Sequence, residues 1–587
     1  MSRRFPLFLV LLLVAPAAFA QVADGYDAER VRDLVAVSGP LRNIVDNLHA
    51  EGDTLWAGQQ LIFTADGGQT WAFVDDDVLT PAIAPTAIVF SIDVEDDIIW
   101  VGLGFSDPAI ASRPQSAAGF AYSEDGGQSW RYQFPQLDAP EDTLQVYGCN
   151  YFAPDAEPED IVPILGCGPT GGETLSFQLP ALPVIVPQQS PPFDIDFDPI
   201  TRDVWVAGWA SGIRRLEWLE DEDRYARDFQ RVVLPPDTLD AIDPTLPYNF
   251  LYAPEIQDAE EGNNFLGFSV LVDETGTVWA GTVAGVNRSR PEDVIELVVF
   301  DRTGTVPTDT LEERAWQRTG FDGTSAGLPG NWVISIEEQP VGDENFAVGT
   351  PENPRNPVWM AVWRAREQQE QFALVVTRDG GETFEPALVG GNRFYDFAFC
   401  PDGAGFCSPS TVYAAGADGL FVSEDDGDTW RSIRDFPDRD RRGRFVRRDA
   451  NVFAVATTTS ALWVGTGDGL LKSDDGGATW TLFRADVPTN PETPSDRVPD
   501  VEAYAYPNPF SPNADRYVRI RYDRTDPASI RIFDFGMNLV RTIPDAAPVE
   551  QVWDGYDEDG NRVANGVYFY EVATGGDSLT GKILVLE

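Results

Sequence analysis

The chain has 587 residues, and its 95 Asp and Glu against 42 Lys and Arg give a formal net charge of −53. A surface of this charge repels nucleic acids and anionic membranes, which excludes both as partners. With 52 Gly, 45 Pro and 16 Trp and no long helical periodicity, the composition favours a large all-β protein.

Residues 1–20 have the pattern of a signal peptide. Arg3 and Arg4 form the charged region, Leu7 to Val14 the apolar region, and Ala18-Phe19-Ala20 the cleavage site. The apolar run is too short to span a bilayer. We therefore expect a secreted or cell-surface protein without a transmembrane anchor after signal removal, in which residues 21–39 form an N-terminal segment.

A two-part phrase recurs over residues 40–485. Its first part is a short apolar run with an aromatic second residue, found at Leu55–Gly58, Ile99–Gly102, Val204–Gly208, Val278–Gly281, Val358–Ala361, Val412–Gly416 and Leu462–Gly465. Its second part, Ser/Thr-x-Asp-x-Gly-x-Ser/Thr-aromatic, occupies Thr64–Trp71, Ser123–Trp130, Thr377–Phe384, Ser423–Trp430 and Ser473–Trp480. Each pair of parts predicts a hairpin, because Asp and Gly favour a tight turn between extended segments.

The repeat predicts seven blades of one β-propeller. The spacing of Asp379, Asp425 and Asp475 matches the roughly 40 to 50 residues of a four-stranded blade. An apolar segment before each phrase is the expected innermost strand: Ile44 to Leu48, Ile88 to Val94, Phe193 to Phe197, Phe265 to Val272, Trp332 to Ile336, Phe394 to Phe399 and Val452 to Ala456. A single blade cannot bury its own faces, so the repeats depend on one another.

The turn that occurs five times resembles the Asp-box, or BNR repeat, of sialidases, xyloglucanases, sortilin-type receptors and photosystem II stability factors. The resemblance implies that the turn aspartates are structural: Asp66, Asp125, Asp379, Asp425 and Asp475. The chain lacks the Arg-Ile-Pro motif of a sialidase before its first turn, and it has room for one propeller where xyloglucanases use two.

Three long insertions follow the second, third and fourth blades, at Gln136 to Pro192, Pro235 to Asn264 and Asp301 to Asn331. All three connect the last strand of one blade to the first strand of the next, so they should emerge on one face. Their large amphipathic residues are the predicted ligand contacts: Tyr147, Tyr151, Tyr248, Tyr252 and Trp316. The alternative is that these rings only anchor the loops.

The four cysteines predict two local disulfides, Cys149 with Cys167 and Cys400 with Cys407. A metal site is disfavoured because His49 is the single histidine and Cys-x-x-Cys is absent. No cofactor is expected, although Ca²⁺ capture by clustered carboxylates stays an alternative to a solvated acidic coat. His49 is predicted to be a solvated turn residue, and Asp194, Asp196 and Asp198 to be structural.

Residues 486–500 are a Pro-rich linker, and residues 501–587 show alternating strands that predict a small Ig-like β-sandwich. Tyr506 to Phe510, Trp553 to Gly555, Asn565 to Tyr570 and Gly581 to Leu586 resemble the FlgD-like Ig domain and the C-terminal sorting domains of type IX secretion. The resemblance implies a sorting or attachment module and an outer-membrane secretion machine as partner. Glu587 stands where such domains usually end in a basic residue.

The sequence therefore predicts an exported, non-enzymatic propeller that binds an extracellular protein or glycan or serves as a scaffold. The alternative is a glycoside hydrolase or lyase that acts on extracellular polysaccharide through a carboxylate pair on the propeller face. No nucleophile motif supports a Ser-His-Asp mechanism, and no catalytic residue is predicted.

Overall fold

The computed structural model places most of the chain in short antiparallel strands. It describes all residues except 1–29, 32–34, 38–39, 41–42, 75–86, 107–114, 134–142, 147–176, 181–189, 210, 227–228, 233, 236, 238, 242–263, 265, 301–306, 325–326, 342–354, 366–368, 441–445, 447–449, 485–502, 507, 513–517, 523–527, 547–549, 574–577 and 587. Contacts divide the chain into two compact units, one holding Met1–Ser38 and Val45–Leu482 and the other Gly39–Ile44 and Phe483–Glu587.

Seven antiparallel sheets, or blades, follow one another along the first unit. The first three blades hold β3 (Leu48–Glu51), β4 (Thr54–Ala57), β5 (Ile62–Thr64) and β6 (Trp71–Phe73); β7 (Ile88–Glu95), β8 (Ile98–Ser106), β9 (Gln115–Ser123) and β10 (Ser129–Gln133); and β13 (Pro192–Phe197), β14 (Val204–Gly208), β15 (Gly212–Leu216) and β18 (Gln230–Arg231). The fourth and fifth hold β19 (Gly267–Val272), β20 (Val278–Thr282), β21 (Gly285–Ser289) and β24 (Gln317–Thr319); and β25 (Trp332–Glu338), β26 (Val358–Trp363), β27 (Phe372–Thr377) and β28 (Glu385–Gly390). The last two hold β29 (Phe394–Phe399), β30 (Val412–Gly416), β31 (Gly419–Ser423) and β32 (Arg431–Ile433); and β33 (Val452–Thr457), β34 (Leu462–Thr466), β35 (Gly469–Ser473) and β36 (Thr481–Phe483).

Shorter pieces extend the blades at their outer ends. β2 (Val35–Val37) pairs with β6 and β1 (Arg30–Val31) pairs with β10, which gives the first two blades a fifth strand. Three two-stranded sheets stand apart from the blade sheets: β11 (Thr143–Val146) with β12 (Phe177–Pro180), β16 (Trp218–Leu219) with β17 (Arg224–Tyr225), and β22 (Val294–Phe300) with β23 (Pro307–Arg314).

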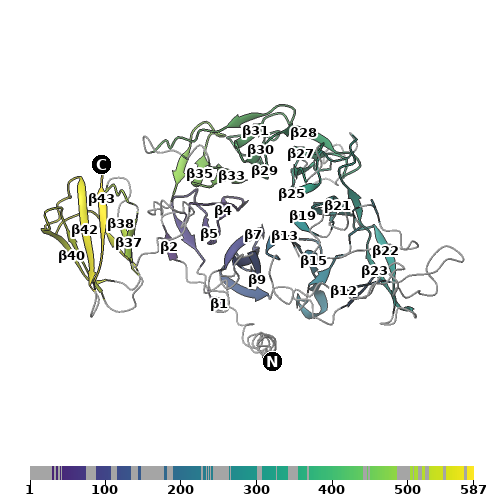
Figure 1. The fold of residues 1–587 in the computed structure, drawn as a ribbon, viewed down its shortest axis with the longest axis horizontal. Coiled ribbons are helices and arrows are strands. Elements are labelled where there is room, and N and C mark those ends of the chain that lie inside the picture. Colours follow the sequence, from purple (N-terminus) through teal and green to yellow (C-terminus); the bar gives the residue numbers. More distant parts are fainter. Residues whose placement is uncertain are drawn as a thin grey trace, which may run out of the picture. The chain divides into compact units, whose positions relative to one another are not determined.

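The first strands of the seven blades form a closed ring. β3 contacts β7, and the contacts continue through β13, β19, β25 and β29 to β33, which contacts β3 again. Figure 1 shows β7, β13, β19, β25, β29 and β33 grouped around the centre of this ring. The first unit is therefore a seven-bladed β-propeller, as the repeat predicted.

The aromatic residue of the repeated apolar run joins each blade to the next. Trp100 packs with Ile195 and Phe197 of the third blade, and Trp279 packs with Val333 of the fifth blade. Trp463 of the last blade meets Trp71 of the first at 5.9 Å between ring centroids, edge to face. Each such ring removes a large apolar surface from water, so the position carries much of the adhesion between blades.

Two of the glycines that end the run, Gly281 and Gly465, have a separate cause, which is close approach of the next blade's backbone. A Cβ on Gly281 would lie 2.5 Å from the Val333 carbonyl oxygen, and a Cβ on Gly465 would lie 2.5 Å from the Val45 carbonyl oxygen. Any larger residue would push neighbouring blades apart.

The segment Ile44 to Leu48 was predicted to be the first innermost strand, and this prediction is wrong by four residues. The strand is β3, Leu48–Glu51, and His49 lies within it, not in a solvated turn. The reason is that the preceding residues serve the seam of the ring, where the Val45 N–H donates to the Thr466 carbonyl of the seventh blade at 3.0 Å.

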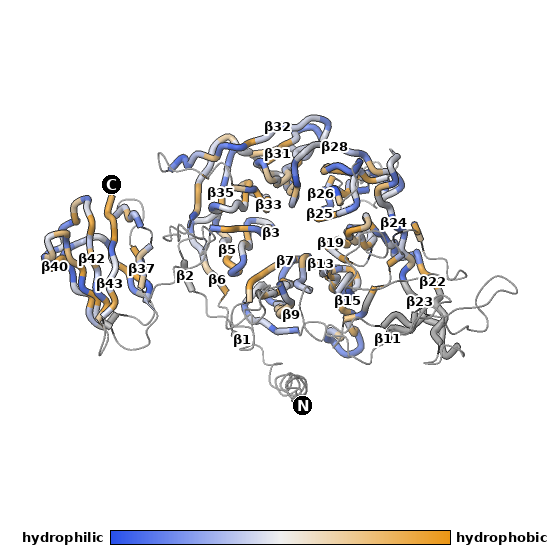
Figure 2. The backbone as a smooth tube through the Cα atoms, viewed as in Figure 1, coloured by the Kyte–Doolittle hydropathy of each residue, from blue (hydrophilic) through white to orange (hydrophobic). Residues whose placement is uncertain are grey.

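The second unit is a small β-sandwich. One sheet holds β37 (Ala503–Tyr506), β38 (Val518–Tyr522) and β41 (Glu550–Trp553), and the other holds β40 (Leu539–Ala546), β39 (Ala528–Phe533), β42 (Gly566–Ala573) and β43 (Ser578–Val585). Ile520 and Trp553 of the first sheet share one buried core with Ile532, Tyr570 and Ile583 of the second. Figure 2 shows hydrophobic residues spread along the strands of both units, including β7 and β33 at the ring centre.

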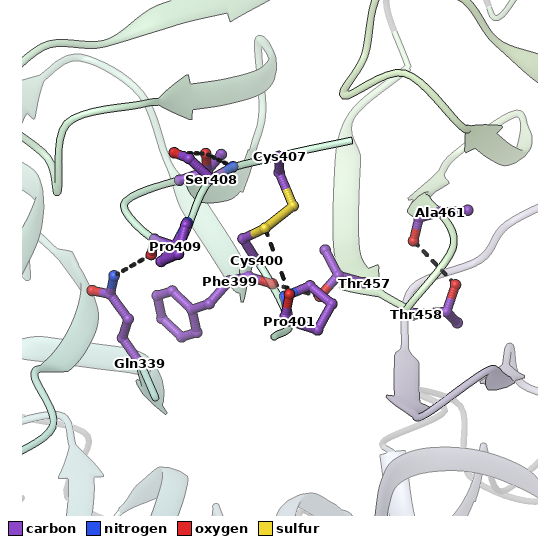
Figure 3. Close-up of a disulfide and its surroundings, with 11 residues drawn as sticks. Gln339, Phe399, Cys400, Pro401, Cys407, Ser408, Pro409, Thr457, Thr458 and Ala461 are labelled. Carbon is purple, nitrogen blue, oxygen red and sulfur yellow. Dashed lines mark hydrogen bonds between the residues drawn. A yellow bond between two sulfur atoms is a disulfide. The ribbon is translucent and has the colours of Figure 1, made fainter. Parts of the chain in front are cut away.

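One of the two predicted disulfides is confirmed. Cys400 and Cys407 are bonded, with Cα atoms 5.8 Å apart, and close the loop between β29 and β30 (Figure 3). The same loop accepts a hydrogen bond from Gln339 Nε2 to the Pro409 carbonyl at 3.4 Å, which ties it to the fifth blade. Cys149 and Cys167 lie outside the described residues. In the part of the chain that the structure describes, no helix has the length and apolarity needed to cross a membrane.

Candidate functional site

The five repeated turns, called Asp turns below, lie between the third and fourth strands of five blades and share one hydrogen-bond pattern. In the last of them, Asp475 Oδ1 accepts the Thr479 N–H at 2.8 Å and Asp475 Oδ2 accepts the Thr479 hydroxyl at 2.6 Å. The Ser473 hydroxyl donates to Asp475 Oδ1 and accepts the Gly477 N–H, both at 2.8 Å. Asp66, Asp125, Asp379 and Asp425 make the equivalent bonds to the residue four positions later. The carboxylates are thus acceptors inside their own turns.

These hydrogen bonds control the charge of the turn. Partial burial acts to raise the pKa of Asp475, but the donors from Thr479, Ser473 and Ala478 outweigh it and lower the pKa to about 2. The pKa of Asp425 is lowered chiefly by the Thr429 hydroxyl and N–H. A carboxylate held ionised by donors of its own turn cannot serve as a general acid at neutral pH.

The innermost strands use aspartates in a different way. Each of these strands pairs on one side only, so its other edge has unpaired N–H and C=O groups. Asp93 Oδ2 on β7 accepts the Phe197 N–H of the next blade at 2.7 Å, and Asp396 Oδ2 on β29 accepts the Val455 N–H at 2.9 Å. An aspartate on one blade therefore satisfies the free edge of the next.

β13 makes this contact twice. Asp194 Oδ2 accepts the Val270 N–H at 2.9 Å and Asp196 Oδ2 accepts the Val272 N–H at 2.6 Å, both on β19. This arrangement confirms that Asp194 and Asp196 have a structural role. Asp198 is also structural, because it accepts the N–H groups of Ile200 and Thr201 in the following turn.

Burial raises the pKa values of the inner aspartates. Below, the name axial carboxylates denotes Asp93, Asp194, Asp196, Asp396 and Glu337. Desolvation is the main cause throughout, and backbone N–H donors oppose it in the aspartates. The pKa of Asp93 rises to about 6 and those of Asp194 and Asp396 to about 7, while that of Asp196 rises well above its usual value. Part of this group is therefore protonated near neutral pH.

Glu337 on β25 differs from the axial aspartates because no hydrogen bond to it occurs among the described residues. Desolvation raises its pKa well above the usual value, and the nearby charges of Asp396, Asp194 and Asp93 raise it further. A half-buried carboxyl with a raised pKa and no structural partner is the best candidate for a proton donor in the ring.

His49 belongs to the same band of residues. Its Nε2 donates to the Val94 carbonyl of the second blade at 3.1 Å, and its Nδ1 lies 4.0 Å from Asp93 Oδ1. Desolvation lowers the pKa of His49, so the ring is neutral near pH 7. Its place in the structure is that of a bridge between the first two blades.

Bulged residues, five of the six aromatic, mark the beginning of six innermost strands. Six of these strands have a register shift near their first residues, and the side chain at the shift is Phe90, Phe193, Phe268, Ile334, Tyr395 or Phe453. A β-bulge re-aims the extra residue away from the regular alternation. All six side chains are partly exposed.

Five of the partly exposed rings form the axial aromatic cluster, which comprises Phe90, Phe193, Trp209, Phe268 and Trp332. Centroid distances are 6.4 Å for Phe90 to Phe193 and 6.3 Å for Phe193 to Phe268. Phe268 also lies 5.2 Å from Trp209 and 5.6 Å from Trp332. The cluster thus runs through residues of the second, third, fourth and fifth blades. Its members Phe193, Phe268 and Trp332 lie near the beginning of the strands that follow the three long insertions.

A second aromatic group continues at the same strand ends in the remaining blades. Tyr395 lies 5.5 Å from Trp363 and 5.4 Å from Phe453. Here the chain supplies its own cation, because the Arg393 guanidinium carbon lies 5.1 Å from the centroid of Trp363. Among the described residues, no Lys or Arg stands over a ring of the axial aromatic cluster.

Of the five residues predicted to contact a ligand, only Trp316 lies within the described residues. Tyr147, Tyr151, Tyr248 and Tyr252 lie outside the described residues. Trp316 is 6% exposed and packs edge to face on Trp205 at 6.1 Å, so it offers no free ring to a ligand. The aromatic cluster was missed because its signal is weak in sequence: one aromatic residue at the start of an apolar run, whose exposure depends on a bulge.

Within the described residues, no group of three or more His, Cys, Asp or Glu side chains is arranged to hold a metal ion.

No family model and no curated protein matches the chain. Among solved structures, PorZ, a bacterial surface component of the type-IX secretion system of Porphyromonas gingivalis, is 14% identical with a TM-score of 0.36, and the match covers 94% of this chain and 61% of PorZ, which is under two thirds of its length. The GH74 enzyme of Niastella koreensis is 11% identical over 95% of this chain and 75% of its own, with a TM-score of 0.42. The β-propeller domain of Cps50 (Swd1) from Myceliophteria thermophila is 8% identical over 74% and 96% of the two chains, with a TM-score of 0.31. All three TM-scores are below 0.5, and the function proposed next is argued from this chain's own residues.

Proposed function

We propose that the chain is an exported Asp-box propeller that binds an extracellular protein or glycan, or serves as a scaffold at the cell surface, without catalysing a reaction. Export is supported by the signal-peptide pattern of residues 1–20 and by the Cys400–Cys407 disulfide, a bond that persists in oxidising compartments.

One observation carries the proposal: the axial aspartates are already engaged by the backbone. Asp93, Asp194, Asp196 and Asp396 each hold an N–H group of the following blade. A glycosidase needs two carboxylates free to face the scissile bond. Because these four aspartates are not free to act as catalytic carboxylates, the partly exposed aromatic side chains are the feature at the centre of the propeller that we propose contacts a ligand.

The test uses the secreted full chain. We expect it to release no new reducing ends from a panel of extracellular polysaccharides and to bind at least one glycan or surface protein in an array format. Turnover of a polysaccharide that survives repurification and disappears in an axial-carboxylate variant would overturn the proposal.

The alternative, a glycoside hydrolase or lyase, is favoured by one residue. Glu337 is the axial carboxyl without a hydrogen-bond partner among the described residues, and its raised pKa suits a general acid. If hydrolysis is detected, Glu337→Gln should abolish it without lowering the melting temperature, and Asp196→Asn, which keeps the contact to Val272, should leave most of it.

For residues 501–587 we propose a FlgD-like Ig module that serves sorting or attachment, joined to the propeller through the linker at residues 486–500. Its two sheets share a core of their own, so it should fold independently. A chain cut near Pro494 should keep the propeller's cooperative melting transition but lose surface attachment or export. Loss of cooperative melting on truncation would instead make the sandwich part of the propeller's core.

A further inference from the structure

We infer that the axial aromatic cluster binds an organic cation, an alkylammonium or guanidinium group presented by the ligand. The inference rests on the proposed binding function and specifies the chemistry of the group that enters the cluster.

The first support is the geometry of the rings. Phe193 and Phe268 are nearly parallel, with 27° between their planes, whereas Trp209 and Trp332 are tilted by 54° and 42° against Phe268. Rings in several orientations around Phe268 can present more than one π-face to the same group. A π-face attracts a cation because the ring quadrupole is negative there.

The second support is the charge of the strands that bear the cluster. β7, β13, β19 and β25 contain no Lys, Arg or His. They contain six carboxylates: Asp93, Glu95, Asp194, Asp196, Glu337 and Glu338. Asp194 directly follows the bulged Phe193, so an acidic and an aromatic side chain are neighbours at the beginning of β13. An apolar surface set in this surplus of negative charge selects a cation over a neutral or anionic ligand.

The third support is an internal precedent. In the neighbouring aromatic group, the Arg393 guanidinium occupies a ring face, 5.1 Å from Trp363 and 5.9 Å from Phe372. In this group the protein therefore places its own cation, the Arg393 guanidinium, over the aromatic rings. The axial aromatic cluster also lies where inner strands begin, with no arginine over its rings among the described residues, and a ligand cation would take the place that Arg393 has in the neighbouring group.

The pH dependence should follow the carboxyls around the cluster. Asp194 faces the charges of Asp93 on β7 and Asp396 on β29, and Asp196 on its own strand and Glu337 on β25 complete the set. Protonation of these groups near and below pH 7 removes negative charge, so affinity for the cation should rise as the pH rises from 5.5 to 8, roughly tenfold for each full charge restored beside it. Burial lowers the pKa of His49, which favours its neutral form.

The experiment measures binding to the full secreted chain by calorimetry with choline, with arginine methyl ester, with a short arginine-containing peptide, and with 3,3-dimethylbutan-1-ol, the neutral isostere of choline. We expect the cations to bind at least tenfold more tightly than the isostere. Tight binding of choline alone would identify a small-molecule ligand, and tighter binding of the peptide would identify a protein side chain; both results support the inference.

Two matched variants locate the site. Phe268→Leu keeps an apolar side chain but removes the π-face, and should weaken cation binding at least fivefold. Phe453→Leu makes the same change in the group served by Arg393 and should leave binding unchanged. Melting temperatures of both variants confirm that the propeller is folded.

Three outcomes would overturn the inference: equal binding of choline and the isostere, no binding of any cation at tens of millimolar, or equal effects of the two variants. These outcomes differ from failure of the proposed function. If a neutral glycan binds and Phe268→Leu weakens that binding, the proposed binding function stands and the cation inference is wrong. If the protein turns over a polysaccharide, the proposed non-catalytic function is itself wrong.

Discussion

The aspartates of the Asp turns and the axial aspartates accept the same kind of hydrogen bond, yet their pKa values move in opposite directions. Asp475 accepts donors from Thr479, Ser473 and Ala478 on an exposed turn, and its pKa falls to about 2. Asp194 accepts two backbone N–H groups inside the ring of inner strands, and its pKa rises to about 7. Desolvation is the cause of the difference, because it penalises the charged form more than two N–H donors can repay.

The contrast also shows what each region can do. The turns at the outside are fixed in one charge state over the whole physiological range, as suits a repeated structural element. The ring centre titrates within that range, so its charge, its stability and its affinity for a charged ligand all respond to pH.

The largest expected effect is on the stability of the propeller between pH 5 and pH 8. A carboxyl with a raised folded pKa stabilises fully below its unfolded pKa and loses this contribution as the pH rises through the folded pKa, here about 6 for Asp93 and about 7 for Asp194 and Asp396. Between its unfolded and its folded pKa, each group lowers the unfolding free energy by about 1.4 kcal/mol per pH unit, and above the folded pKa the change ends. Thermal melts should give a melting temperature several degrees lower at pH 8 than at pH 5. An equal or higher value at pH 8 would mean that the axial carboxylates are not desolvated as described.

The next effect concerns one Asp turn. Asp475→Ala removes the acceptor for Thr479 and Ala478 and should cost about 2 kcal/mol of unfolding free energy at pH 7, measured by denaturant titration. Because the folded pKa of Asp475 is lowered, its contribution is present above the unfolded pKa and is lost as the pH falls toward about 2. The difference between variant and parent should therefore shrink near pH 2, and a constant difference would contradict this account.

A matched pair of Asn substitutions sharpens the comparison. Asp196→Asn keeps an oxygen for the Val272 N–H and removes a buried ionisable group, so it should stabilise the propeller more at pH 8 than at pH 5. Asp425→Asn at an Asp turn should destabilise at pH 8, because the amide replaces one of two accepting oxygens. The same sign of effect at both sites would remove the distinction between the two regions.

The smallest effect is expected at His49. Burial lowers its folded pKa, so it stabilises above its unfolded pKa near 6.5 and loses this contribution as the pH falls. His49→Gln can still donate to the Val94 carbonyl and does not titrate. As the pH is lowered from 8 to 5, the free energy of unfolding of the variant should increase relative to that of the parent by up to about 1 kcal/mol. A loss on acidification would show that the histidine is stabilised in its charged form by Asp93 or Glu51.

How far the sequence predicted this molecule depends on whether a feature repeats in register. The aromatic-glycine run and the Asp turn recur at blade spacing, and the blade number and the sequence of strands follow from them. The seam does not repeat: Val45 reaches the seventh blade, which shifted the first inner strand to Leu48–Glu51. The ring centre was hardest to predict, because Phe193 looks like any strand residue until a bulge sets it outside the alternation. Likewise Trp316 was predicted to contact a ligand, but it is buried and packs against Trp205.

The seam has a mechanical consequence. The four main strands of every blade come from one contiguous stretch of chain, and among the described residues no strand from the beginning of the propeller enters its last blade. Among the described residues, the contacts that hold the first blade to the last include Trp71 on Trp463, the Val45 N–H to Thr466 carbonyl hydrogen bond, and the hydrogen bonds from Thr459 to Gly52 and Asp53. Under mechanical load or heat the first and last blades can separate while each blade stays folded, so unfolding should begin at this seam. The same construction lets new ends be cut between any two blades, with the old ends joined by a linker, without dividing a sheet.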